Sequence, residues 1–221
     1  MPKINILVEG ITEEVFVKQV LDPYINHRFN ATSISAVVLA TKIDRDGKKW
    51  RGGLNNYAKF RSDAKKLLAD RGASLLTCMI DLHALPHDFP GYHEAAGLPF
   101  RSKVSLLESR LFDDLANDRF LPYISTHEFE ALLLSNPRLL SEIVGGTADQ
   151  LTSFMNRLPN GCSPEAINSD LHPSSRILQA FPQFDKVRHG ATFAEKARLD
   201  EIRRSCEHFN QWISHIEPNC Q

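Results

Sequence analysis

Apolar and polar positions in the first forty residues alternate between a strand pattern and a helix pattern. Residues 4–8 form a short apolar run, and apolar residues then recur at helical spacing between residues 12 and 29. A second apolar run, rich in β-branched residues, covers 34–39. Since strand-helix-strand connections are right-handed crossovers, the two runs are predicted to be parallel strands of one sheet.

The pattern continues with further strands and helices up to about residue 124. Residues 42–53 are polar, basic and rich in turn formers, which predicts an exposed arm. A helix is predicted from Tyr57 to a glycine stop at Gly72. The almost wholly apolar stretch 74–81 predicts a strand covered on both faces. A helix over 104–115 and a short fourth strand at 121–124 follow.

The C-terminal part of the sequence has a mainly helical pattern. A helix is predicted at 127–134, and beyond it short helices alternate with prolines and glycines, without another convincing strand. One apolar stripe between residues 202 and 216 predicts a last helix that packs into the core. We therefore expect an α/β domain over 1–135, with a mostly parallel four-stranded sheet flanked by helices, and a helical extension packed on it over 136–221.

Composition narrows the cellular setting. The 221 residues contain no run of about 20 apolar residues, and the N-terminus enters a strand without a basic-then-apolar signal. We therefore expect a cytoplasmic protein with no membrane partner. Its four cysteines are widely spaced, without a metal-binding pattern, so they are predicted to be reduced thiols.

Charge is unevenly distributed along the chain. The net charge is -1, which gives no overall attraction to nucleic acid. Residues 42–71, however, hold ten Lys or Arg against four Asp, a local charge of +6 that leaves -7 for the remainder. Such a segment can contact phosphates, and an aromatic residue in it can stack on an unpaired base. The alternative is a solvated basic surface with no ligand.

Acidic residues stand at the ends of two predicted strands. Glu9, followed by Gly10, ends the first strand, and Asp81 ends the third. In open α/β sheets ligands bind at the carboxyl ends of the strands, so both side chains are expected in one crevice. Carboxylate oxygens suit Mg²⁺, which can activate a phosphodiester and an attacking water, while a further carboxylate acts as acid or base. Alternatively, each residue merely caps a helix or turn.

Other polar positions are weaker candidates. Glu130 lies three residues after His127, so the two would share a helix face, where they could either act chemically or simply pin the helix. Histidines in the loop after Asp81, at 83, 87 and 93, fit no standard zinc spacing. There is no Walker A, GxSxG or full GxGxxG motif, so the chain itself is not expected to bind ATP through a P-loop.

These motifs resemble a known family. The stretch LVEGITE, with its strand-end glutamate, and the later strand ending in Asp81 resemble the Toprim catalytic domain of topoisomerases, primases and OLD-family nucleases. The stretches MIDLHALPHDFPG, HEFEALLLS, SSRI, FDKVRHG and CEHFNQWISHIE extend the resemblance over nearly the whole chain, to a bacterial Toprim-like family akin to RloB-type proteins. Proteins of that kind are often encoded beside an ATPase and are linked to phage defence.

The resemblance implies roles for particular residues. Glu9 would be the catalytic acid or base, and Asp81 would hold Mg²⁺ or Mn²⁺. The second aspartate of the Toprim DxD pair is replaced by His83, which suits Mn²⁺ or another transition metal better than Mg²⁺. Asp88 or Glu130 could supply the missing oxygen ligand, and Glu130 matches a Phe-Glu position shared with RloB-type proteins.

Together these features predict a metal-dependent nuclease that works with a separate ATPase in phage defence. The alternatives are a Toprim-derived binding or sensor subunit without catalysis, which the histidine at position 83 favours, and an enzyme acting on a small phosphorylated molecule. The candidate nucleic-acid partners are DNA and RNA, and the candidate protein partners are a separate ATPase and a second copy of the chain. The residues expected to contact nucleic acid are Lys48, Lys49, Trp50, Arg51, Lys59, Arg176 and Lys186. For Arg176 and Lys186 the alternative is ion pairing with neighbouring acids.

Overall fold

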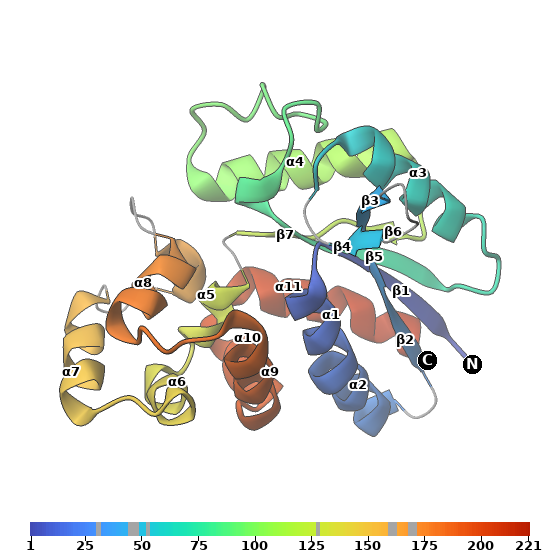
Figure 1. Cartoon of the computed structure of the whole chain (residues 1–221). Helices are drawn as coiled ribbons and strands as arrows, with labels where there is room; N and C mark the ends of the chain where they lie inside the picture. Colours follow the sequence, from blue (N-terminus) through green and yellow to red (C-terminus); the bar gives the residue numbers. More distant parts are fainter. Residues whose placement is uncertain (30–31, 44–48, 52–53, 127–128, 159–162, 168–171) are drawn as a thin grey trace.

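A parallel sheet forms the centre of the computed structural model (Figure 1). The structure describes residues 1–29, 32–43, 49–51, 54–126, 129–158, 163–167 and 172–221. The strands of the sheet are β1 (Lys3–Val8), β2 (Ser33–Val38), β5 (Leu75–Asp81), β6 (Phe120–Leu121) and β7 (Ile124–Ser125). Their order is β2-β1-β5-β6, β7 also pairs with β5, and each of these pairings is parallel. The predicted α/β class is confirmed, although two short strands replace the single fourth strand.

Helices cover both faces of this sheet. On one face α1 (Ile11–Phe16) continues through a π-helical turn, η1 (Val17–Leu21), into α2 (Asp22–Phe29), beside α11 (Glu207–Ile216). On the other face lie α3 (Tyr57–Leu68) and α4 (Phe100–Leu115) (Figure 1). Alternate residues of β5 point to opposite faces of the sheet, and each face has its own hydrophobic core. Leu75 and Met79 belong to one core, and Leu76, Cys78 and Ile80 to the other. A strand buried on both faces explains the continuous apolar run in the sequence.

The remaining helices form a lobe beside the sheet (Figure 1). They are α5 (Glu130–Leu133), α6 (Pro137–Val144), α7 (Ala148–Arg157), α8 (Pro173–Ala180), α9 (Lys186–Lys196) and α10 (Leu199–Ser205). Short 3₁₀ turns are η2 (Leu82–Ala84), η3 (Pro164–Ala166) and η4 (Glu217–Cys220). One hydrophobic cluster joins Ile4 and Phe16 to Phe193 and Phe209, so the C-terminal part shares a core with the sheet. The domain boundary near residue 135 stays a prediction.

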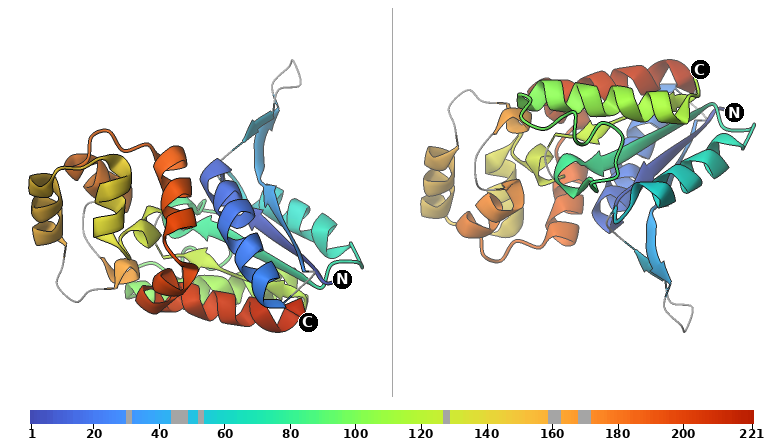
Figure 2. Two further views of the ribbon diagram at one scale, coloured as in Figure 1. Left: turned by 90° about the horizontal axis from the view of Figure 1, so that it is seen from below. Right: turned by 90° about the horizontal axis from the view of Figure 1, so that it is seen from above.

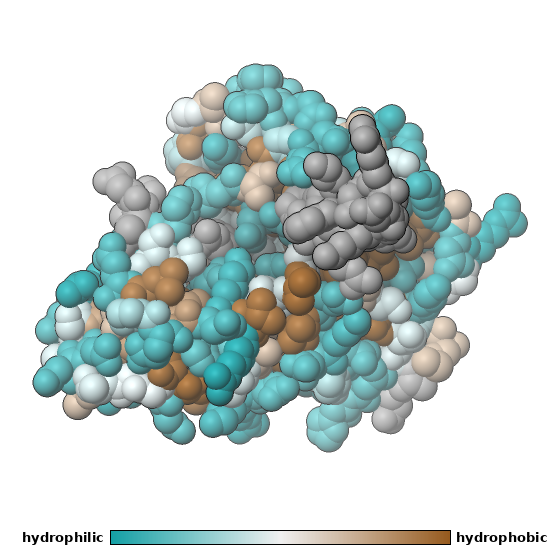
Figure 3. All heavy atoms as spheres, in the orientation of Figure 1, coloured by the Kyte–Doolittle hydropathy of each residue, from teal (hydrophilic) through white to brown (hydrophobic). Residues whose placement is uncertain are grey.

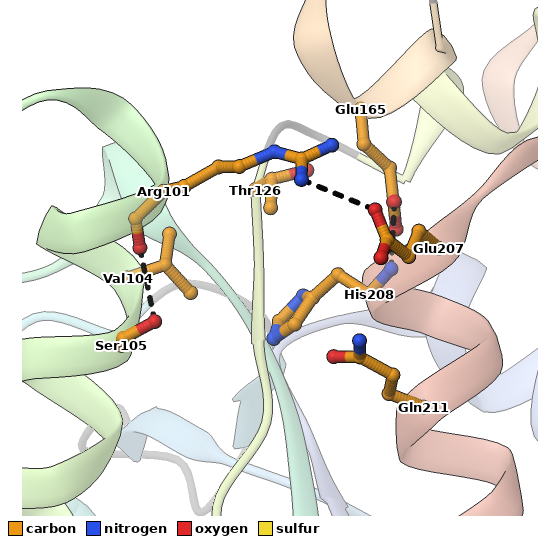
Figure 4. Close-up of a pocket in the computed structure, with 8 residues that line it drawn as sticks. All are labelled: Arg101, Val104, Ser105, Thr126, Glu165, Glu207, His208 and Gln211. Atoms are coloured by element: carbon orange, nitrogen blue, oxygen red, sulfur yellow. Dashed lines mark hydrogen bonds and ion pairs between the residues drawn. The ribbon is translucent and has the colours of Figure 1, made fainter.

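The predicted last helix is two helices, because the backbone is extended at Cys206 (φ -121°, ψ 95°). The start of α11 is capped from a distant part of the chain. The Glu165 carboxylate accepts the backbone N–H of His208 at 2.9 Å (Figure 4) and that of Phe209 at 2.8 Å. On the sheet side, Trp212 Nε1 donates to Thr77 Oγ1 at 2.8 Å and holds α11 against β5. An acid that caps a helix from more than forty residues away is invisible to local pattern reading.

The predicted basic arm contains a small antiparallel hairpin. Its strands, β3 (Ala40–Ile43) and β4 (Lys49–Arg51), project away from the main sheet (Figure 2). Residues 44–48 and 52–53 lie outside the described part of the chain. The arm is therefore a separate feature and not an extension of the central sheet.

Hydrophilic residues predominate on the face shown in Figure 3, with apolar patches at its centre and lower left. Among the helices that the structure describes, none combines the length and the apolar character needed to cross a bilayer.

Candidate active site

The carboxyl edge of the sheet brings the two strand-end acids together. Val8, the last residue of β1, pairs with Met79 of β5, so Glu9 and Asp81, which follow them in the chain, lie at the same edge of the sheet. Glu9 donates its backbone N–H to the Met79 carbonyl at 3.3 Å, and its Oε2 accepts the backbone N–H of Asp81 at 3.1 Å. Glu9 and Asp81 thus occupy one crevice, where open α/β sheets hold their ligands.

Two further acids join this crevice from neighbouring helices. Glu13 on α1 is 5% exposed, and Glu130 on α5 is fully buried. Burial raises the pKa of the Asp81 carboxyl well above its ordinary value, and the negative charges of Glu9, Glu13 and Glu130 raise it further. We call Glu9, Glu13, Asp81 and Glu130 the acidic cluster.

One ammonium group balances part of this charge. Lys186, the first residue of α9, places its Nζ 3.1 Å from Glu130 Oε1, while its side chain remains 44% exposed. Burial would lower the pKa of Lys186, but the charges of Glu130, Glu13 and Asp81 outweigh that effect, and its pKa is raised. Lys186 is therefore a cation that both contacts the acidic cluster and reaches solvent.

Local sequence features deliver Lys186 to this position. Asp185 caps α9 by accepting the Arg188 backbone N–H at 2.7 Å. One turn into the helix, Gly190 faces α5 and α1: a Cβ there would lie 3.3 Å from Phe129 Cε1 and 3.8 Å from Thr12 Cγ2. The glycine therefore allows α9 to approach the helices that carry Glu13 and Glu130.

A graded substitution at Gly190 tests this close approach. We expect Gly190→Ala to change the free energy of unfolding by less than about 1 kcal/mol, because the gain in helix propensity offsets a small shift of Phe129. Gly190→Val should cost about 2 kcal/mol, because its branched side chain overpacks the contact with Phe129 and Thr12. Urea denaturation of the three proteins measures both changes. Equal stability of the valine variant and the wild type would contradict this packing.

His83 and Asp88, the other two metal ligands predicted from the sequence, have contacts outside the acidic cluster. His83 is exposed in η2, and its ring meets the ring of His172 edge-on with centroids 4.9 Å apart. Both Asp88 carboxylate oxygens accept the Tyr57 backbone N–H, at 3.1 and 3.2 Å, so Asp88 holds the start of α3. In the loop, His87 and His93 pack on Tyr92, and Glu94 pairs with Arg110 at 2.7 Å.

The candidate nucleic-acid contacts are scattered over several elements. Lys59 on α3 forms an ion pair with Asp63 one turn later, and Arg176 is half-buried on α8. Lys49, Trp50 and Arg51 form β4, of which the structure describes the backbone. Lys48 and the predicted helix partner His127 lie outside the described residues. Of this set, Lys186 is the residue that the structure places at the acidic cluster.

The donor chemistry fits a hard divalent cation, although the ligands are not pre-arranged. Within the described ranges, no three His, Cys, Asp or Glu side chains are positioned to ligate one ion. Burial and, after it, the charges of Glu9, Glu13 and Glu130 nevertheless disfavour the ionised form of Asp81, and a divalent cation would favour it. In the metal-free protein the positive charge of Lys186 lowers the pKa of Asp81 and so partly offsets these effects.

Glu13 is the site residue that sequence reading missed. An acid in the first turn of a helix, such as Glu13, is ordinarily explained by its favourable interaction with the positive end of the helix dipole. Its position four residues after Glu9 was the available signal, but its burial depends on α9 packing across α1, which no local pattern reveals.

Fold and site define an α/β protein with an acidic cluster at the carboxyl edge of its parallel sheet. The chain belongs to the DUF4276 family, described as a domain of unknown function, whose model matches residues 8–217. A comparison with curated proteins finds no match.

Solved structures with similar folds include C-terminal regions of OLD proteins. The Burkholderia pseudomallei region has a TM-score of 0.42 and 16% identity, covering 96% of this chain and 98% of that one. The Xanthomonas campestris pv. campestris region has a TM-score of 0.41 and 18% identity, covering 96% of this chain and 95% of that one. At this level of likeness a shared function does not follow, so the chemistry is argued from the residues of this chain.

Proposed function

We propose that this protein is a metal-dependent phosphodiesterase that acts on nucleic acid. The observation that carries the proposal is the acidic cluster at the carboxyl edge of the sheet, with the partly exposed ammonium of Lys186 beside it. Burial and the charges of three neighbouring carboxylates raise the pKa of Asp81, a counter-charge would offset both effects, and hard divalent cations bind such oxygen sets. A structural ion pair would require only Glu130 and Lys186.

Each residue of the site has a proposed task. Glu13, Asp81 and Glu130 would hold Mg²⁺ or Mn²⁺ through their oxygens, and His83 would add a nitrogen ligand that favours Mn²⁺. Such an ion, when bound, polarises a phosphodiester and lowers the pKa of an attacking water. Glu9, at the turn after β1, would accept a proton from the attacking water or return one to the leaving oxygen.

Lys186 would act on the substrate side. Its Nζ donates to Glu130 and reaches solvent, so it can also donate to a non-bridging phosphate oxygen and orient the scissile group. Asp88 is left out of the proposed ligand set because its carboxylate is bound to the start of α3.

Nucleic acid is the proposed substrate class because of the basic segment 42–71, which includes the exposed arm 42–53. The segment 42–71 carries a charge of +6, and part of it forms the projecting β3–β4 hairpin (Figure 2). We propose phosphate or base contacts by Lys48, Lys49, Trp50, Arg51 and Lys59, with Arg176 as a further contact. A small phosphorylated substrate would leave this arm without a role.

Cleavage assays with a matched pair of variants test the proposal. Purified protein is incubated with Mg²⁺ or Mn²⁺ and single-stranded DNA, double-stranded DNA or total RNA. We expect Glu9→Gln to reduce cleavage by at least about 100-fold, because a positioned acid or base contributes on that order. Glu142→Gln, an exposed glutamate on α6, should cleave like the wild type. Equal cleavage by Glu9→Gln would contradict the assignment.

The wider setting is proposed from the sequence resemblance to RloB-type proteins. In it the protein serves anti-phage defence together with a separate ATPase, since the chain has no P-loop of its own. The proposal requires an ATPase gene beside that of this protein. Co-expression with its product should lower phage plaque counts, and Glu9→Gln should abolish that protection. Full protection by the variant would exclude nuclease-based defence.

The second candidate function is a Toprim-derived nucleic-acid-binding or sensor subunit without catalysis. The observations in its favour are the exposed His83 in place of an aspartate and the absence, among the described side chains, of a ready three-ligand arrangement. Metal binding separates the two functions: a true site raises the melting temperature by mass action when Mg²⁺ or Mn²⁺ is added, and a lost site does not.

A further inference from the structure

Arginine side chains line a groove on a different part of the molecule. Its volume is about 410 Å³, and it lies between α2, α10 and the first turns of α11. The residues that line it are Arg28, Arg198, Asp200, Arg203, Arg204 and Asn210. Four guanidinium groups thus face one acid across a single hollow.

Two of these arginines are held in place by the protein. Arg203 donates to Asn210 Oδ1 at 2.7 Å and to the Tyr24 hydroxyl at 2.9 Å, and it pairs with Glu217. Arg28 lies over the Tyr24 ring, 4.3 Å from its centroid, and its Nη2 is 2.8 Å from Asp200 Oδ1. These contacts fix the floor of the groove and neutralise its two built-in cations with Asp200 and Glu217.

The other two arginines have their donors available. Arg198 and Arg204 are exposed, and within the described part of the chain neither guanidinium has a hydrogen-bond or ion-pair partner. Arg198 is the N-cap residue of the short helix α10 and Arg204 lies in its last turn, and both line the same groove. An arginine fork binds phosphate through two parallel hydrogen bonds, and a pair of free forks over a pre-organised floor suits two phosphates better than a single carboxylate.

The groove is separate from the acidic cluster. Glu13 belongs to that cluster and Arg28 to the groove, and both lie on the continuous helical segment from Ile11 to Phe29. At a rise of about 1.5 Å per residue, the positions are about 22 Å apart along the helix axis. A ligand that contacts both must be a polymer, since a nucleotide is too short.

We propose that this arginine groove binds the phosphate backbone of nucleic acid at a second contact, remote from the acidic cluster. The identification of nucleic acid as the bound polyanion rests on the proposed function. The groove anchors a strand through Arg198 and Arg204, while Arg28 and Arg203 keep the floor in shape. The contact is expected to be independent of base sequence, because only phosphates are recognised.

The test measures binding without cleavage, using the full chain in EDTA. Fluorescence anisotropy reports binding of labelled 20-nucleotide single strands and duplexes, of DNA and of RNA, over a series of salt concentrations. The double variant Arg198→Glu/Arg204→Glu should bind at least about tenfold more weakly. Its plot of log K against log salt should be shallower by about 1.8 for duplex DNA and about 1.4 for single strands, since about 0.9 or 0.7 is lost per phosphate contact. The control Arg138→Glu/Arg157→Glu makes the same charge change at exposed positions on α6 and α7.

The outcomes are distinct. A specific loss in the groove variant, with the control within about threefold of the wild type, supports the inference. Equal losses in both variants mean that only net charge matters, and the inference is wrong. The inference is also overturned if the wild type binds inorganic tripolyphosphate but no nucleic acid. It is likewise overturned if the wild type binds neither. Since no metal is present, any of these results stands apart from the cleavage test of the proposed function.

Discussion

Asp81→Asn is expected to abolish metal-dependent cleavage while raising the melting temperature of the metal-free protein. The pKa of this carboxyl is raised by burial and by the charges of Glu9, Glu13 and Glu130, so its ionised form opposes folding near neutral pH. Asparagine removes that charge without changing the shape. We expect a gain of about 1–2 kcal/mol, which corresponds to about 3–6 °C for a chain of this size.

The sign of the pH dependence is specific. A carboxyl whose pKa in the folded state lies above its unfolded value of about 3.9 lowers stability at pH values above the unfolded pKa. The advantage of Asp81→Asn should therefore be largest near neutral pH and should shrink as the pH falls toward about 4. Thermal melts between pH 4 and 8 measure it.

Added Mg²⁺ or Mn²⁺ completes this experiment. It should raise the melting temperature of the wild type and leave that of Asp81→Asn nearly unchanged, because the variant lacks a ligand. Asp149→Asn, at an exposed position on α7, is the control and should respond like the wild type. If Asp81→Asn loses stability at neutral pH, or still responds fully to metal, the electrostatic description of the site is wrong.

Removing the Lys186 ammonium is expected to lower both the stability of the protein and its cleavage activity. In Lys186→Met the Glu130 carboxylate would be left fully buried without its ion-pair partner. Breaking a fully buried pair costs about 3–5 kcal/mol, and because Lys186 is partly exposed we expect about 2 kcal/mol in urea denaturation. Cleavage should also fall, since the same group is proposed to orient the scissile phosphate.

A double-mutant cycle separates the loss of the pair from other effects of the substitution. Lys186→Met combined with Glu130→Gln removes both charges, and much of the lost stability should return. Lys196→Met, at an exposed position at the end of the same helix, is the matched control and should change stability by less than about 0.5 kcal/mol. Strictly additive losses at 186 and 130 would mean that the two residues do not interact energetically.

Both predictions concern one balance of charge. In the metal-free protein the positive charge of Lys186 offsets part of the negative charge of the acidic cluster. Burial makes the remaining negative charge unfavourable for folding. Proteins accept such destabilising arrangements at sites where a ligand later supplies the missing interaction. Lower stability of the wild type than of Asp81→Asn would be the signature of that arrangement here.

The sequence by itself determined the class of fold and part of the site. Apolar runs at 4–8 and 74–81 predicted strands because a strand covered on both faces has no polar side, and the acids that follow them were predicted to share a crevice. The structure brings Glu9 and Asp81 together, because parallel neighbouring strands end at the same edge of a sheet.

Only the tertiary structure decided the rest of the cluster. Glu13 and Lys186 meet because Gly190 lets α9 pack closely on α1, a contact between segments more than 170 residues apart in the chain. The break at Cys206 likewise depends on a cap from Glu165. Periodicity reports which face of an element is buried, but not which distant side chain faces it, because that choice is made by packing between elements.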